Sequence, residues 1–231
     1  MSMPFYVPAE QMMKDKADYA RKGIARGRSL AAVTFTNGIL LCAENAFDTL
    51  HKIAEIYDRI AFGGVGLFTE FDELRRAGVR AADMKGYAFS REDVDARSLA
   101  NQYGQILRNI FTHELKPMEV EIIVAEVGAD QSRDELYHVL FDGAVVAEKG
   151  YTAMGGDAEA VMERLQGAYD ADADIGAALN ACVSALAGPD RTIPASELEV
   201  AVLERTAERR AFRRLHDDEI EGLLPSAPTA S

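Results

Sequence analysis

Residues 30–43 read Leu-Ala-Ala-Val-Thr-Phe, then Thr-Asn-Gly, then Ile-Leu-Leu-Cys-Ala: two apolar runs separated by an Asn-Gly pair. Asn-Gly between apolar runs is the strongest short signal for a β-hairpin, because both residues accept the positive φ of a tight turn. We therefore predict antiparallel strands over residues 30–35 and 39–43. Neither run alternates apolar and polar residues, so we expect both faces of this sheet to be covered.

Further helices and strands are predicted on both sides of this hairpin. A helix is expected over residues 9–22, with Pro8 in its first turn, Gly23 at its C-cap, and Met13, Ala17 and Ala20 on one face. Gly63-Gly64-Val65-Gly66 is expected to break the chain. The other predicted strands are 53–62, 120–127, 135–141, 144–147, 151–154, 198–203 and 211–215. The other predicted helices are 67–82, one from about Asp93 to before Pro117, 157–169, 174–187 and 217–224.

The order of these elements predicts the fold class. Strands and helices come in blocks of two or more, which argues against a parallel βαβ sheet and for antiparallel sheets with helix pairs packed outside. We expect an α/β fold of the α+β type, a four-layer α/β/β/α sandwich over residues 9–224. Residues 1–8 precede it as a short segment, and residues 225–231 are expected to be a disordered tail.

Composition excludes several classes of protein. The 231 residues are 48 % apolar and 27 % charged, which is a globular composition. The net charge of −13 repels phosphates, so nucleic acid is not an expected partner. Cys42 and Cys182 lie in apolar runs and are expected to be buried free thiols. No apolar run approaches the roughly 20 residues that span a bilayer, so we expect a cytoplasmic protein without membrane contact.

No familiar catalytic or cofactor motif is present. No two of the four histidines are spaced i, i+4, and neither cysteine has a nearby ligand, so no metal site is expected. The sequence lacks G-x-x-x-x-G-K-[ST], G-x-G-x-x-G and G-x-S-x-G, and no cofactor is expected. The arginines of residues 205–214 are interrupted by acidic residues, which favours a solvated strand face or a subunit contact over nucleic-acid binding. The residues alone would fit a generic ligand-binding α/β domain.

Several blocks of the sequence nevertheless resemble one family, in the right order and over residues 5–224. The blocks are Asp18-Tyr19-Ala20-Arg21, Gly27-Arg28-Ser29, the hairpin from Val33 to Leu41, Lys52-Ile53-x-x-Ile56, and Gly155-Gly156 before a helix. Together they resemble proteasome α subunits. Residues 20–26, 57–59 and 210–214 resemble the actinobacterial members in particular. The resemblance implies the four-layer sandwich of the N-terminal nucleophile hydrolases.

The same resemblance implies a function and partners. Proteasome α subunits form homo-heptameric outer rings on proteasome β subunits, and the β subunits carry an N-terminal threonine nucleophile. The α ring gates the entry of substrates and receives the C-terminal tails of a ring-shaped ATPase or an ATP-independent activator. The actinobacterial likeness implies pupylated substrates.

The alternative is a catalytic, β-like threonine or serine hydrolase. The position that matches the β nucleophile lies near Arg28, with Ser29 beside it. Arginine cannot be the nucleophile, and Ser29 could be one only if the chain were cut before it to free an amine base. Lys52 matches a lysine that assists the β threonine, and Glu44 lies near the place of the acid. A lysine and an acid without a nucleophile favour the non-catalytic α role, and we expect no catalytic residue.

The resemblance also implies site residues. Lys52 is expected in the pocket that receives an activator tail, where its ammonium would meet the terminal carboxylate. Gly27 would let the backbone of the tail approach closely. The gate is expected at Phe5, Tyr6, Val7 and Pro8, an apolar segment too short to fold alone.

Overall fold

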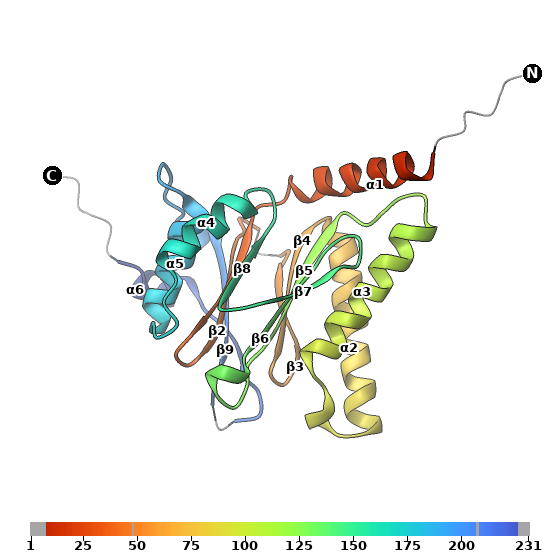
Figure 1. The fold of residues 1–231 in the computed structure, drawn as a ribbon. Coiled ribbons are helices and arrows are strands. Elements are labelled where there is room, and N and C mark those ends of the chain that lie inside the picture. The colour runs from red at the N-terminus through yellow and green to blue at the C-terminus, as the bar shows by residue number, and fades with distance from the viewer. Residues whose placement is uncertain (1–7, 48, 207, 226–231) are drawn as a thin grey trace, which may run out of the picture.

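The computed structural model describes residues 8–47, 49–206 and 208–225. Two five-stranded antiparallel sheets lie face to face between two layers of helices (Figure 1). One sheet has the strand order β10-β9-β2-β1-β8 and the other β3-β4-β5-β6-β7. The predicted four-layer sandwich is therefore confirmed.

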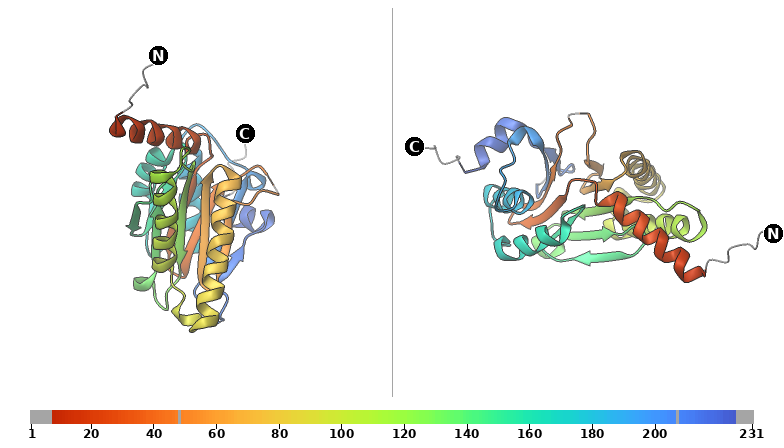
Figure 2. Two further views of the ribbon diagram at one scale, coloured as in Figure 1. Left: turned by 90° about the vertical axis from the view of Figure 1, so that its right-hand side faces the viewer. Right: turned by 90° about the horizontal axis from the view of Figure 1, so that it is seen from above.

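The elements of the first sheet and its helices come from both ends of the chain. They are β1 (Leu30–Phe35), β2 (Gly38–Glu44), β8 (Tyr151–Met154), β9 (Leu198–Glu204), β10 (Phe212–Arg214), α4 (Ala158–Ala168), α5 (Ile175–Ala187) and α6 (Asp217–Leu223). The second sheet and its helices come mostly from the middle. They are β3 (Ile53–Tyr57), β4 (Ile60–Gly66), β5 (Val120–Glu126), β6 (Glu135–Val139), β7 (Val145–Glu148), α2 (Phe68–Ala88) and α3 (Ala96–His113). Helix α1 (Ala9–Ile24) lies across one end of the sandwich (Figures 1 and 2).

The β1–β2 hairpin is buried on both faces. Phe35 pairs with Gly38 across a two-residue turn at Thr36-Asn37, so Gly38 begins β2 and is not a turn residue, and every residue of both strands is buried. Ala31, Val33 and Phe35 point into a core shared with α4 and α5, whereas Leu30 and Ala32 point into the core between the sheets. Successive side chains of β1 thus point into two different cores, which explains why neither face of this strand is polar in the sequence.

The strand predicted over residues 53–62 is wrong, because these residues form parts of two strands. β3 and β4 are joined by a turn at Asp58-Arg59, and Gly63–Gly66 continue β4 instead of breaking the chain. A Cβ on Gly63 would lie 3.0 Å from a methyl of Leu30, and one on Gly64 would lie 2.8 Å from the Phe71 ring. These glycines allow the second sheet to approach both the first sheet and α2.

Helix boundaries differ from the prediction at three places. Helix α1 runs on to Ile24, whose side chain is buried between the sheets, so Gly23 is not the C-cap. Helix α2 continues to Ala88 although residues 83–88 include the weak helix formers Asp83, Gly86 and Tyr87, and Gly86 faces the Tyr57 hydroxyl of β3, where a Cβ would clash. Asp95, not Asp93, is the N-cap of α3, and its carboxylate accepts a hydrogen bond from the Ser98 amide.

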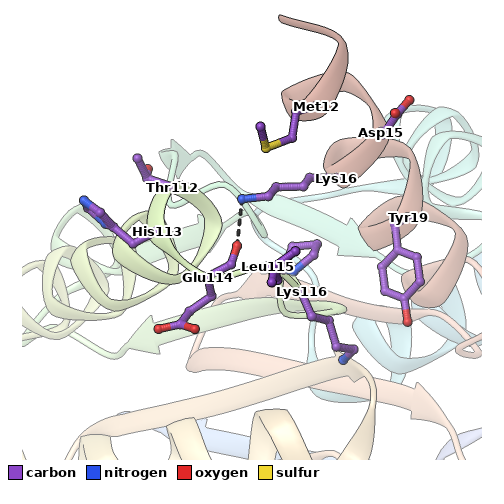
Figure 3. A pocket seen from close by; sticks show the side chains of 10 residues that line it. Met12, Asp15, Lys16, Tyr19, Thr112, His113, Glu114, Leu115 and Lys116 are labelled. Carbon is purple, nitrogen blue, oxygen red and sulfur yellow. Dashed lines mark hydrogen bonds between the residues drawn. The ribbon is translucent and has the colours of Figure 1, made fainter. Parts of the chain in front are cut away.

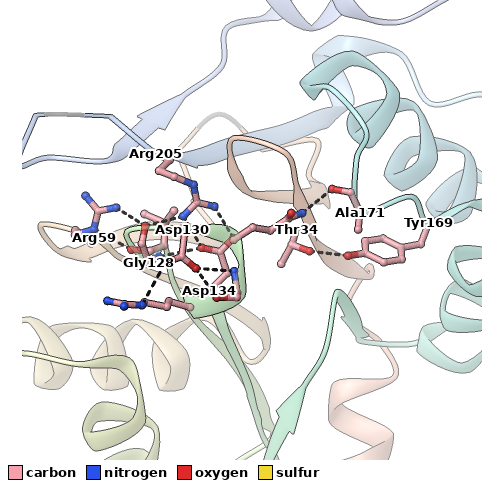
Figure 4. A network of polar contacts seen from close by, with 12 residues as sticks. Thr34, Arg59, Gly128, Asp130, Asp134, Tyr169, Ala171 and Arg205 are labelled. Atoms are coloured by element: carbon pink, nitrogen blue, oxygen red, sulfur yellow. Dashed lines mark hydrogen bonds and ion pairs between the residues drawn. The ribbon is translucent and has the colours of Figure 1, made fainter.

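The end of the sandwich far from α1 is closed by a polar network (Figure 4). The Arg205 guanidinium donates to both carboxylate oxygens of Asp134, at 3.0 and 2.9 Å, and to the carbonyl oxygen of Gly128. Arg59 donates to the carbonyl oxygens of Val127 and Gly128. Arg205 is thus committed to an intramolecular ion pair. Arg210, Arg213 and Arg214 are likewise paired with glutamates of the same chain.

Cys42 and Cys182 are buried free thiols, as predicted, and burial raises the pKa of Cys42 to about 12. In the part of the chain that the structure describes, no helix is both long and apolar enough to cross a bilayer. The same residues contain no group of three His, Cys, Asp or Glu side chains that could hold a metal ion.

Replacing Tyr103 with phenylalanine should leave the protein as stable or make it more stable by about 1 kcal/mol, because the Tyr103 hydroxyl is buried without a hydrogen-bond partner among the described residues. The ring packs against Phe62, and its hydroxyl faces Gly78 of α2. Chemical unfolding of the purified protein measures the change. Tyr137→Phe is the control: the Tyr137 hydroxyl bonds Glu135 and Arg97, so its loss should not stabilise the fold. A loss of more than 1 kcal/mol in Tyr103→Phe would contradict the account of this hydroxyl.

Candidate functional site

Lys52 lies where the start of β1, the end of β2 and the start of β3 meet. Its Nζ donates to the carbonyl oxygen of Arg28 at 2.8 Å and to that of Glu44 at 2.9 Å. An ammonium has three N–H donors. Within the described residues, the third N–H of Lys52 has no hydrogen-bond partner, and the side chain is half-buried. The site therefore holds a fixed cation with one donor left for an incoming acceptor.

Glu199 of β9 fixes the backbone on which Lys52 stands. Its carboxylate accepts from the amides of Lys52 and Ile53, at 2.8 and 3.1 Å, and from the side-chain amide of Asn45. Arg214 pairs with the same carboxylate at 2.5 Å. The sequence analysis did not predict Glu199 as part of the site. A single acidic residue within the apolar run of residues 198–203 could have indicated a buried, paired carboxylate.

The charge of Lys52 is affected mainly by its burial. Desolvation lowers the pKa of Lys52 from 10.5 to about 8, Glu199 opposes this by its negative charge, and Arg28 adds to it. Lys52 is therefore mostly protonated at neutral pH, and it loses its charge as the pH rises through about 8.

Glu44 is buried and held by two arginines. Arg191 binds it in a bidentate manner, with Nη1–Oε1 and Nη2–Oε2 distances of 3.0 Å, and Arg28 forms a second ion pair with Oε1. Arg191 lies in the loop after α5, and nothing in its sequence context pointed to this contact. A carboxylate with both oxygens engaged in this way is a structural ion pair and is poorly placed to accept a proton.

Ser29 has neither a free amine nor an activating base among its described contacts. Its nitrogen lies in the peptide bond after Arg28, and its hydroxyl accepts a hydrogen bond from the Asp157 amide at 3.2 Å. The residue is 8 % exposed. The nucleophile-lysine-acid arrangement of a threonine hydrolase is thus not assembled by these three positions.

Gly27 lies one residue before Arg28, whose carbonyl Lys52 binds. The structure supplies a packing reason for this glycine: a Cβ would lie 2.7 Å from Val65 Cγ1 and 3.2 Å from the Ile24 carbonyl oxygen. Its carbonyl oxygen accepts from the Gly156 amide at 3.1 Å. A side chain at Gly27 would therefore push the segment between α1 and β1 away from Val65 of β4, and this segment includes Arg28, whose carbonyl oxygen binds Lys52.

The predicted gate lies mostly outside the described residues. Phe5, Tyr6 and Val7 fall there, whereas Pro8 is exposed and forms the N-cap of α1, with its carbonyl oxygen accepting from the Met12 amide at 3.1 Å. Pro8 lies at the start of α1, whereas Lys52 contacts Arg28, which follows the other end of this helix. The 16 residues of α1 span about 24 Å at 1.5 Å per residue. The two predicted sites are separate.

Comparisons with known proteins agree with this fold. The "Proteasome subunit" family model matches residues 24–203. "Proteasome subunit alpha" of Acidimicrobium ferrooxidans is 55 % identical over 231 residues, covering 100 % of both chains. The protein of the same description from Thermomonospora curvata is 54 % identical, covering 97 % of this chain and 98 % of the relative. That from Rhodococcus opacus is 47 % identical, covering 100 % and 92 %.

The chain therefore belongs to the proteasome subunit family. Within that family it is an α subunit of the core particle, similar over its full length to the actinobacterial relatives. The family resemblance inferred from the sequence is confirmed.

Proposed function

We propose that this chain is a non-catalytic subunit of a seven-membered outer ring. It stacks on a ring of β subunits, gates the entry of substrates with residues 1–8, and receives activator tails at Lys52. The chain thereby serves protein degradation without performing the cleavage. It needs no cofactor for this role and works in the cytoplasm.

The observation that carries this proposal is the Lys52 ammonium. The backbone carbonyls of Arg28 and Glu44 hold it in place, its remaining donor is unpaired within the described residues, and Gly27 directly precedes Arg28 in the chain. A positioned cation of this kind suits the terminal carboxylate of a peptide. Each tail would bind weakly, so the activator would need several tails at once.

The test is co-expression with the cognate β subunit, followed by native and intact mass measurement and a peptidase assay. We expect a particle in which this chain keeps its full N-terminal sequence and the β subunit loses its propeptide. Loss of residues 1–28 from this chain on assembly would instead support the alternative, a serine or threonine hydrolase with Ser29 at its new N-terminus.

Assembly should depend on the exposed methionines of α1. Met12 and Met13 are 46 % and 38 % exposed, whereas Tyr103 of α3 is buried within its own chain. Met13 also does not share the buried face of α1, which consists of Lys16, Ala20 and Ile24.

We expect the double change Met12→Asp, Met13→Asp to shift the particle to smaller species by native mass measurement, because ring contacts of obligate size, above roughly 2,000 Å², exclude charge from their centre. Gln166→Asp, on the exposed face of α4, is the control for added charge. If the double variant forms rings of normal size, Met12 and Met13 do not lie in the interface between subunits.

A further inference from the structure

Helix α1 is attached to the body of the subunit mainly through its second half. Its buried residues are Lys16, Ala20 and Ile24, and the last two belong to the core between the sheets. Tyr19 and Arg21 add cation–π contacts with Lys116 and Phe141. Among the described residues before Ala17, Lys16 alone is buried.

Lys16 contacts α3 at the helix C-terminus (Figure 3). Its Nζ donates to the carbonyl oxygen of Phe111 at 3.1 Å and to that of Glu114 at 2.7 Å, and the residue is 8 % exposed. The last carbonyls of a helix have no partner within the helix and carry the negative end of its dipole, so a cation there is favourable. Lys16 thus adds from α1 a charged donor to the C-terminus of α3.

The segment that receives Lys16 is itself held in place. Lys116 pairs with Glu70 of α2 at 2.5 Å, and the other Glu70 oxygen accepts from the Glu119 amide at 2.7 Å. The end of α3 is therefore a fixed support, and the freedom at this contact belongs to α1.

We propose that Lys16 is a positioning residue for the entry gate. It attaches the first half of α1 to α3 of the same subunit and so helps to set the direction of the chain at Pro8. This inference rests on the proposed gating function. Seven residues separate Ala9 from Lys16, or about 10 Å of helix, so a small swing of α1 about Ala20 and Ile24 is enlarged at its first residue.

The test compares Lys16→Met, Lys16→Gln and Lys16→Arg in particles assembled with the β subunit. Methionine keeps the apolar stem but donates no hydrogen bond, glutamine keeps a donor with a shorter reach, and arginine keeps the charge. Lys14→Met is the matched control, because Lys14 is exposed on the same helix. Two quantities are measured: hydrogen exchange of the amides of residues 13–20, and the hydrolysis of a small fluorogenic peptide.

We expect Lys16→Met and Lys16→Gln to speed exchange in residues 13–20 by about tenfold, since a buried hydrogen-bonded charge is lost. We expect both variants to raise peptide hydrolysis about twofold to threefold. Lys16→Arg should restore both values, and Lys14→Met should change neither. In particles that lack residues 2–8, Lys16→Gln should still speed exchange but should no longer change hydrolysis.

Two results would overturn the inference. Unchanged exchange in both the methionine and glutamine variants would show that Lys16 does not hold α1. The second result is faster exchange with unchanged peptide hydrolysis, in a particle whose hydrolysis does respond to deletion of residues 2–8. It would show that the gate exists but that Lys16 does not affect it. If that deletion has no effect, the proposed gate itself fails, whatever the exchange data show.

Discussion

Replacing Lys52 with alanine should stop activator-driven degradation of folded proteins and leave the hydrolysis of small peptides by the particle unchanged. The ammonium of Lys52 is held by the carbonyl oxygens of Arg28 and Glu44, and the proposal gives its third donor to the tail carboxylate. Without that charge the tail loses its anchor, and several weak contacts fail together. Degradation of a protein substrate, peptide hydrolysis and activator binding are measured on the same particles.

The alanine variant also leaves two carbonyl oxygens without their donor, so a control must separate binding from local structure. Lys52→Arg retains a positive charge and should keep part of the activator binding. Lys149→Ala, an exposed lysine next to β7, should behave as the wild type. Full activator binding by an assembled Lys52→Ala particle would return Lys52 to a purely structural role.

The same site predicts a pH dependence. Because the pKa of Lys52 is lowered to about 8, its ammonium is present below that pH and is lost above it. Activator binding by the wild type should therefore weaken between pH 7 and 9, whereas Lys52→Arg should keep its binding, since arginine stays protonated throughout this range. Parallel profiles for the two particles would show that another group controls the pH response.

Deleting residues 2–8 should raise the hydrolysis of small peptides several-fold, with assembly unchanged. The segment contains Phe5, Tyr6 and Val7, an apolar sequence that a merely solvated terminus does not need. In a seven-fold ring, seven copies would crowd one axis and obstruct it. Steady-state hydrolysis of a fluorogenic peptide by full-length and truncated particles measures the effect.

An activator offers an internal control for this deletion. If the activator and the deletion act on one gate, the acceleration should shrink once the activator is bound. Replacing residues 2–8 with an equally long Gly/Ser sequence separates the effect of apolar content from that of length. Equal rates for full-length and truncated particles, without an activator, would remove the gate from this account.

Local signals in the sequence predicted most of the fold. The Asn-Gly pair predicted the hairpin, although its turn is Thr36-Asn37. Asp174 was predicted to begin α5, and its carboxylate accepts from the Ala177 amide there. The failures lie where tertiary contacts override local rules. Gly63 and Gly64 look like chain breakers, but they belong to β4 because Leu30 and Phe71 need the space.

The site was predictable in part, through family resemblance more than through the residues themselves. Lys52 was named from its place after the hairpin. The Glu199 carboxylate meets Lys52, and the Arg191 guanidinium meets Glu44, each across 147 positions of the sequence, so no local pattern brings them together. The same holds for Lys16, whose partners Phe111 and Glu114 lie 95 and 98 positions further along the sequence.

Because the β1–β2 hairpin is buried on both of its faces, it has to be protected while the chain is being synthesised. Residues 30–35 and 39–43 carry no charge, and such segments aggregate when they are left uncovered. The hairpin ends at Glu44, but the helices that cover one of its faces are complete only at Ala187. At about 5–20 residues per second, the ribosome leaves that face uncovered for on the order of ten seconds. The nascent subunit should therefore be a substrate for chaperones that bind apolar extended segments, until α5 emerges.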